Sequence, residues 1–130
     1  MPVTATTLIP STTFGSQSGN YDGSTSGFWS DPAKGDGYYG YADGLHTASW
    51  SIKSFTGKVT IQASLLETPT ETDWFDVTLV DSAGTAQGTA QTYSTSTSHV
   101  AYNFTGNFVN VRAYISEWTE GSIVKVRFNY

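Results

Sequence analysis

Four carboxylates lie within one stretch of ten residues and are the first candidates for chemistry: Glu67, Glu71, Asp73 and Asp76. Glycoside hydrolysis needs two carboxyl groups about 5–10 Å apart, one of them acting as an acid. The same run is also typical of a polar loop between two strands, with its acids in contact with water. We favour the loop, and a glycosidase remains a distant alternative.

Three further aspartates lie in a glycine-rich stretch and could hold a metal ion: Asp31, Asp36 and Asp43. Carboxylate and backbone carbonyl oxygens are the ligands that Ca²⁺ prefers. The spacing does not match an EF-hand loop, and aspartates in turns often accept local backbone hydrogen bonds instead. A structural Ca²⁺ is therefore a candidate, and no other cofactor is expected.

Nucleophilic catalysis has little support in this sequence. Cysteine is absent, which excludes thiolate nucleophiles, disulfides and Cys-ligated metal sites. The two histidines, His46 and His99, are far apart, and neither is followed by a Ser/Asp pattern that would suggest a catalytic triad. We therefore expect no catalytic residues and a protein that is not an enzyme.

Aromatic side chains make up 15% of the chain, which is more than a small core requires. Exposed rings stack on sugars or fill the surfaces of protein partners. Trp50 and Trp74 lie in alternating segments, where rings are usually part of the core. The candidates for contact with a partner or a glycan are Tyr38, Tyr39, Tyr41 and Trp118.

The charge balance excludes some classes of partner. The chain has eleven acidic and six basic residues, its net charge is −5, and no Lys/Arg cluster is present. Nucleic-acid binding requires a basic surface that displaces counterions from phosphates, so we expect no nucleic-acid partner. No apolar run approaches the ~20 residues needed to span a bilayer, and no signal peptide follows Met1, so we expect no membrane association.

The length of 130 residues predicts a single domain. Residues 1–26 are rich in Thr, Ser and Gly, and we interpret them as an edge strand near residues 3–9 followed by an arm. Residues 27–130 form the predicted β-sandwich domain. Within it, residues 27–47 are predicted to be an ordered loop pinned by its own rings.

Two segments repeat one design, in which apolar and polar residues alternate on both sides of a Phe-Thr-Gly sequence. The first covers residues 50–63, with the break at Thr56 and Gly57. The second covers residues 99–115, with the break at Thr105 and Gly106. Alternation with a central break is typical of a hairpin, so we predict two hairpins of the same kind.

The remaining segments complete the predicted sheets. Residues 74–80 and 123–130 alternate as strands, and residues 86–97 have the small polar composition of an exposed edge strand. The sum is about eight strands without helical periodicity. This pattern predicts an all-β fold, a two-sheet antiparallel β-sandwich that is jelly-roll-like.

Several of these motifs, in this order, resemble a small virion structural domain of cyanophages and other marine tailed phages. They are residues 34–47 (KGDGYYGYADGLHT), 55–65 (FTGKVTIQASL), Pro69 with residues 73–75 (DWF), 102–113 (YNFTGNFVNVRA) and 121–130 (GSIVKVRFNY). Residues 1–26 lie outside the resemblance.

The resemblance implies a non-enzymatic virion protein made in the host cytoplasm, such as a capsid decoration, neck or tail/fibre component. Its expected partners are other copies of itself and other virion proteins, because phage particles are built from symmetric copies. A surface with few charges and many hydroxyl groups agrees with such contacts. The alternative is a carbohydrate-binding module for glycans of the host surface.

Overall fold

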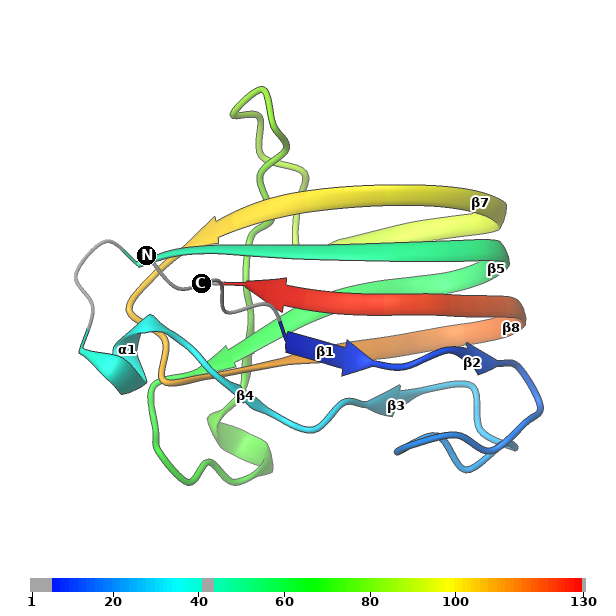
Figure 1. Ribbon diagram of the computed structural model, residues 1–130, viewed down its shortest axis with the longest axis horizontal. Coiled ribbons are helices and arrows are strands. Elements are labelled where there is room, and N and C mark those ends of the chain that lie inside the picture. The colour runs from blue at the N-terminus through cyan, green and yellow to red at the C-terminus, as the bar shows by residue number, and fades with distance from the viewer. Residues whose placement is uncertain (1–5, 41–43, 130) are drawn as a thin grey trace.

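The computed structural model describes residues 6–40 and 44–129, and it confirms the predicted all-β sandwich (Figure 1). The strands are β1 (Thr6–Ile9), β2 (Thr12–Thr13), β3 (Phe28–Trp29), β4 (Ala33–Lys34), β5 (Leu45–Ser64), β6 (Phe75–Asp76), β7 (Ala90–Thr105) and β8 (Asn110–Asn129). Two single turns of helix, α1 (Asp36–Tyr39) and a 3₁₀ turn (Glu71–Asp73), complete the elements. Among the described residues, none of the helices is long and apolar enough to cross a membrane.

Three long strands build both layers of the sandwich, because β5, β7 and β8 each fold over on themselves (Figure 1). The folds are marked by left-handed backbone at Ser54 in β5, at Thr95 in β7, and at Glu117 and Gly121 in β8. A strand can turn through such a corner when a bulge or a left-handed residue breaks its pleat. The three corners lie along one side of the molecule, so each strand enters one layer and leaves by the other.

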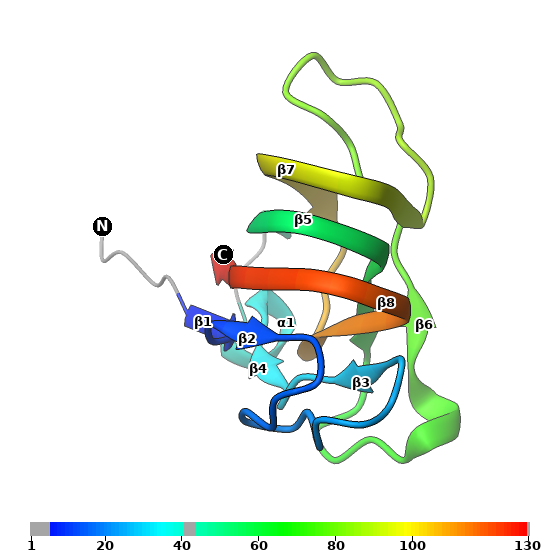
Figure 2. The same cartoon turned by 90° about the vertical axis from the view of Figure 1, so that its right-hand side faces the viewer.

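The strand pairing is antiparallel throughout, and β5 lies at the centre of both layers (Figure 2). In the first layer, the early part of β5 pairs with the late parts of β7 and β8, and β1 and β2 extend the sheet beyond β8. In the second layer, the late part of β5 pairs with β6 and the early parts of β7 and β8, and β3 and β4 lie beyond β8. All eight strands are thereby joined in one folded sheet.

The prediction of two hairpins is wrong. Thr56 and Gly57 do not form a turn between two strands, because both lie inside β5 at its corner. The second segment does contain a connection after Thr105, but this connection passes from one layer to the other. Among the described residues, β7 and β8 do not pair with each other, since each pairs with β5.

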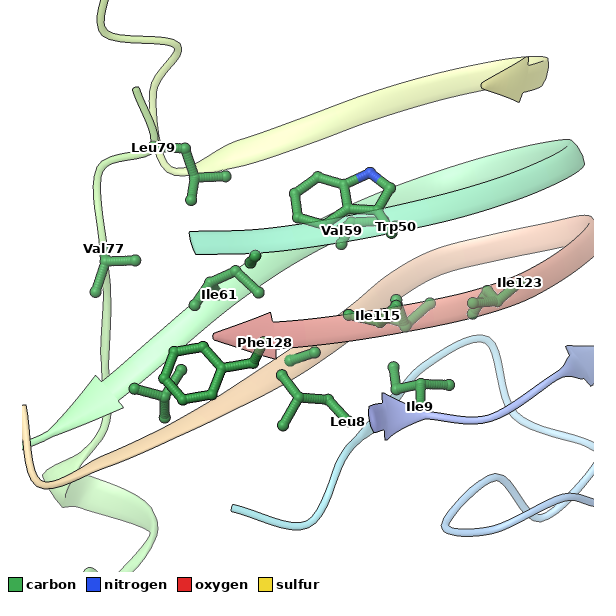
Figure 3. Close-up of a cluster of buried hydrophobic side chains, with 14 of the residues drawn as sticks. Leu8, Ile9, Trp50, Val59, Ile61, Val77, Leu79, Ile115, Ile123 and Phe128 are labelled. Carbon is green, nitrogen blue, oxygen red and sulfur yellow. The ribbon is translucent and has the colours of Figure 1, made fainter. Parts of the chain in front are cut away.

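The core lies between the layers, where the inward side chains of both sheets meet (Figure 3). Val59 and Ile61 of β5 and Ile115 of β8 line the second layer, and Trp50 and Phe128 line the first. All are at most 1% exposed. This alternation of buried and exposed positions is what the sequence pattern predicts for strands with one face on a core.

The segment before β3 is part of this core. Tyr21 is fully buried and packs against Phe28 and Trp118, with ring centroids 5.3 Å and 4.8 Å away. Thr12 and Thr13 pair with β8. Leu8, Ile9 and Tyr21 therefore belong to the same core as the rest of the described chain.

Polar side chains connect the three corners. The Thr56 hydroxyl donates to Oε1 of Glu120 over 2.9 Å and accepts a hydrogen bond of 2.8 Å from the backbone N–H of Thr95. The Thr95 hydroxyl donates to the same Glu120 oxygen over 3.0 Å. The corner of β5 is thus bonded to the corners of both neighbouring strands.

Replacing Thr56 by valine is expected to lower the free energy of unfolding by about 1–2 kcal/mol, because the Thr95 N–H loses its partner and the corners lose their bridge. Urea denaturation monitored by tryptophan fluorescence measures the change. The control is Thr92→Val, since Thr92 is exposed on β7 and makes no side-chain hydrogen bond among the described residues. Equal midpoints for the two variants would contradict a structural role for this bridge.

Candidate functional site

Two of the predicted contact residues are exposed. Tyr38 and Tyr39 lie in α1, are 44% and 45% exposed, and make an edge-to-face pair with ring centroids 5.1 Å apart. The Lys34 ammonium lies 4.7 Å from the centre of the Tyr38 ring. Tyr41 lies outside the described residues. The helical turn α1 therefore exposes two rings to solvent, beside the Lys34 cation.

The prediction that Trp118 is a contact residue is wrong, because Trp118 is fully buried. Its ring packs against Phe14, Tyr21 and Phe28 with centroids 5.4, 4.8 and 6.1 Å away. Its indole N–H donates to the Glu120 carbonyl over 2.9 Å. The sequence around it is polar, but the corner of β8 turns this one ring inward.

The proposed calcium ligands lie in different surroundings. Asp31 is exposed and accepts a 3.0 Å hydrogen bond from the Asn20 amide. Asp36 is 1% exposed at the start of α1, and Asp43 lies outside the described residues. Over residues 6–40 and 44–129, no three His, Asp or Glu side chains gather as a metal ion requires.

The two histidines lie in different environments. His46 is fully buried, and its ring stacks on Phe104 and Phe128 with centroids 5.1 and 5.6 Å away. The backbone N–H of Asp36 donates to its Nε2 over 3.1 Å, so this nitrogen carries no proton. His46 thereby fixes α1 to the core. His99 is exposed on β7.

Three of the four clustered carboxylates make a local contact. Asp73 accepts from the backbone N–H of Thr70 over 2.7 Å and caps its own 3₁₀ turn. Asp76 accepts from Gln62 over 3.1 Å. Glu71 lies 3.7 Å from the Arg112 guanidinium. These contacts are of the kind expected in a polar loop between two strands.

An aromatic and arginine cluster that the sequence analysis did not single out lies on the outer face of the second layer. Arg112 of β8 contacts two indole rings, with its guanidinium carbon 4.2 Å from the centre of Trp74 and 5.2 Å from that of Trp29. Trp29 of β3 also stacks on Tyr114 of β8, with ring centroids 5.0 Å apart and planes 15° apart. We call these four residues the Trp29–Arg112 cluster.

The strand register builds this cluster. Trp29 is the direct partner of Tyr114 across β3 and β8, and Arg112 is two residues earlier on β8, hence on the same face. Trp74 immediately follows the capped 3₁₀ turn and precedes β6, which pairs with the end of β5. The cluster is therefore held by paired strands on both sides and is not carried by a loose loop.

Arg112 is the charged centre of the cluster and is only 7% exposed. Its Nε–H donates to Oε1 of Gln62 over 2.9 Å. Burial lowers the pKa of Arg112, while the nearby carboxylate of Glu71 raises it. A guanidinium stays protonated at neutral pH in either case, so the cluster holds a fixed positive charge between rings.

A groove of about 360 Å³ opens beside the cluster. Its walls include Trp74, Arg112, Lys34 and Glu67. Asn110 lies at its base and donates from Nδ2 to the carbonyls of Leu66 and Glu67 over 2.8 and 3.1 Å. These bonds hold the 66–67 backbone against the start of β8.

The groove combines the features of a site for a small polar ring. An indole ring supplies a flat apolar surface, and cationic and carboxylate groups supply hydrogen-bond donors and acceptors at its rim. Trp29, which is 42% exposed, extends the aromatic surface beyond the groove. A sugar residue has both an apolar ring face and hydroxyl groups at its edge, and so matches this arrangement.

The whole fold recurs in a known protein. One solved structure that matches is the crystal structure of the SPBc2 prophage-derived protein YomS. The match covers 98% of this chain and 92% of YomS, with a TM-score of 0.63 and 10% sequence identity. At this identity the likeness to YomS establishes a shared fold. No protein-family model and no curated protein sequence matches the chain.

Proposed function

We propose that the chain is a non-enzymatic structural protein of a tailed-phage particle. The observation that carries the proposal is the likeness to the prophage-derived YomS, which extends over almost the whole of both chains. The resemblance of several sequence motifs to a virion domain of cyanophages and other marine tailed phages points to the same proposal. The chain would act at the particle surface as a capsid decoration, neck or tail/fibre component.

The surface of the described residues suits contacts between subunits. Hydroxyl side chains cover much of β7, and exposed rings are present at Phe14, Trp29, Tyr38 and Tyr39. Such a surface loses little on desolvation, because few charged groups must give up water. The expected partners are further copies of the chain and other virion proteins, and neither nucleic acid nor membrane.

Particle localisation tests this proposal. Particles of the virus that encodes the chain are purified on a density gradient, and an antibody against the chain is applied for immunogold electron microscopy. Labelling at one fixed position is expected, and that position distinguishes head, neck and tail. If the chain is abundant in infected cells while purified particles carry no label and no peptide of it, the proposal is wrong.

The Trp29–Arg112 cluster favours a second function, the binding of a host-surface glycan. For this function we propose an aromatic platform at Trp29 and Trp74. The candidates named from the sequence were different: Tyr38, Tyr39, Tyr41 and Trp118. The specific observation is that Trp74 lines a groove together with Lys34 and Glu67. Trp29 lies outside this groove, on the other side of the Arg112 contact. A particle protein with such a groove could also contact the host.

Replacing Trp74 by alanine is expected to weaken glycan binding by about tenfold or more, since loss of a ring contact is worth roughly 1.4 kcal/mol. A glycan array identifies the ligand, and calorimetric titration of the wild type and the variant measures the difference. Tyr39→Ala is the control, because it removes an exposed ring of α1 that does not line the groove. Equal weakening in both variants, or no signal on the array, would exclude this groove as the site.

A further inference from the structure

We infer that the outer edge of β7 pairs with the same edge of a second copy, so that the first layer of the sandwich continues across a two-fold axis. This inference rests on the structural role proposed above. It specifies one partner, a second copy of the chain, and the strand edge that contacts it. It is carried by the length of this edge, its composition and the direction of its backbone groups.

Strand β7 is the one long edge strand in the described part of the chain. It has 16 residues and pairs on one side with β5. On the other side it makes a single bridge, from Val80 to Asn103. The other strands at the margins of the layers, β1, β2, β3, β4 and β6, have two to four residues each.

The bridge at Asn103 shows which backbone groups of β7 point outward. Asn103 and Val80 exchange both of their backbone hydrogen bonds, each 2.8 Å long. The N–H and C=O of Asn103 therefore face away from β5. Because these groups alternate along a strand, those of Ala101, His99 and Thr97 face the same way, and no strand of the described chain pairs with them.

The composition of this edge lacks the features that usually prevent pairing. Natural edge strands carry Lys, Pro or other charges, or are kept short. The sequence of β7, AQTYSTSTSHVAYNFT, contains no Lys, Arg, Asp, Glu or Pro. Between its corner at Thr95 and Asn103, the register with β5 is regular from Ser98 onward. An extended, neutral and regular edge of this kind is a template for another strand.

The opposite edge of the first layer, formed by β1, is protected against pairing with another strand. This favours a second β7 edge as the partner of β7. Strand β1 has four residues, its register with β8 shifts between Thr7 and Ile9, and Pro10 follows it directly. A head-to-tail contact would have to use this edge. A contact of β7 with itself uses the unprotected edge twice, and a two-fold axis is the commonest symmetry of protein assemblies.

The register of the pairing follows from the three outward residues. Antiparallel pairing about a two-fold axis at His99 places His99 opposite His99 of the second copy, and Thr97 opposite Ala101. Each of these pairs exchanges both backbone bonds. Val100 and Tyr102, which are half-buried against the core at this edge, would be covered further by the second copy.

Single cysteines test the register directly, because the chain has no cysteine of its own. Residues opposite each other in a hydrogen-bonded pair have Cα atoms about 5.5 Å apart, which lies within the range for a disulfide. His99→Cys is expected to form a covalent dimer under mild oxidation. Thr97→Cys and Ala101→Cys should each remain uncrosslinked alone and should form a mixed dimer when combined.

The surface contact is tested without crosslinking by light scattering coupled to gel filtration. The wild type is expected to dimerise, and His99→Lys is expected to be monomeric, because it places two ammonium groups opposite each other. Thr7→Lys, an exposed change on the protected edge, should leave the dimer intact, and circular dichroism should show all three folded.

The inference is overturned if the wild type is a monomer up to millimolar concentration, or if His99→Cys crosslinks no better than Thr7→Cys. Crosslinking of Thr97→Cys with itself would exclude the register. None of these results depends on whether immunogold finds the chain on particles, so the edge contact and the virion role can fail separately.

Discussion

Trp118→Ala is expected to lower the free energy of unfolding by about 3–5 kcal/mol, the cost typical of removing a buried tryptophan. Trp118 is fully buried where the corner of β8 meets the segments before β3. Rings from three parts of the chain surround it, and Phe55 of β5 lies 5.9 Å away between ring centroids. The cavity left by the change would remove packing from all of these segments, and the Glu120 carbonyl would lose its indole donor.

Chemical denaturation monitored by circular dichroism measures this loss. Trp29→Ala provides the control, because it removes an indole that is 42% exposed and lies outside the core, and it should cost about 1 kcal/mol. If Trp118→Ala does not fold at all, Trp118→Phe should fold with an intermediate stability. Similar losses at Trp118 and Trp29 would contradict the burial of Trp118.

Gly121→Ala is expected to cost about 2–5 kcal/mol, from two contributions of about 1–2 and 1–3 kcal/mol. The first is the left-handed backbone of Gly121, whose φ is +90°. The second is a clash, because a Cβ atom at this position would overlap the carbonyl oxygen of Ser54 in the corner of β5. The two corners would have to separate, which would also disturb the bonds that Thr56 makes.

Gly84→Ala separates the two contributions. Gly84 has a similar φ of +85°, but a Cβ atom there meets nothing within 4 Å. The free energy of unfolding of Gly84→Ala should therefore fall only by the cost of the left-handed backbone, about 1–2 kcal/mol. Thermal or urea unfolding of both variants gives the difference, and equal losses would show that the corners of β5 and β8 are not in close contact.

The sequence predicted the fold class but not the course of the strands. Alternation identifies which residues face the core, and it does so correctly on both sides of Thr56 and Gly57. It does not reveal whether the chain reverses there or only folds over, because a turn and a corner break the alternation in the same way. The difference depends on the partners of Lys58, which pairs with Thr92 and Ser116 on distant strands.

The Trp29–Arg112 cluster could not be assembled from the sequence for a similar reason. Its rings come from β3, from the segment before β6 and from β8, and only the pairing of these strands brings them together. One signal was present. Arg112 alternates with Val111 and Ala113 in a strand, and an arginine that is buried in a sheet needs partners that share or contact its charge.

The aromatic loop shows the opposite case. A glycine-rich segment with several rings predicts both exposed and buried aromatics, and composition cannot assign them. Within residues 27–47, Trp29, Tyr38 and Tyr39 are exposed, while Phe28 and His46 are buried. The stacking of His46 on Phe104 and Phe128 has no signal in the local sequence. Whether each ring is buried or exposed depends on contacts between the two layers.

The course of β8 also has a consequence for synthesis of the protein. Residues 110–129 pair with β5 in both layers and with β1 to β4 at the margin, so neither layer has its full set of neighbours until this segment has left the ribosome. Until then, the edge of β5 that pairs with β8 has no partner, and pairing between segments so distant in sequence is slow. Newly made copies would be most prone to aggregation during that interval.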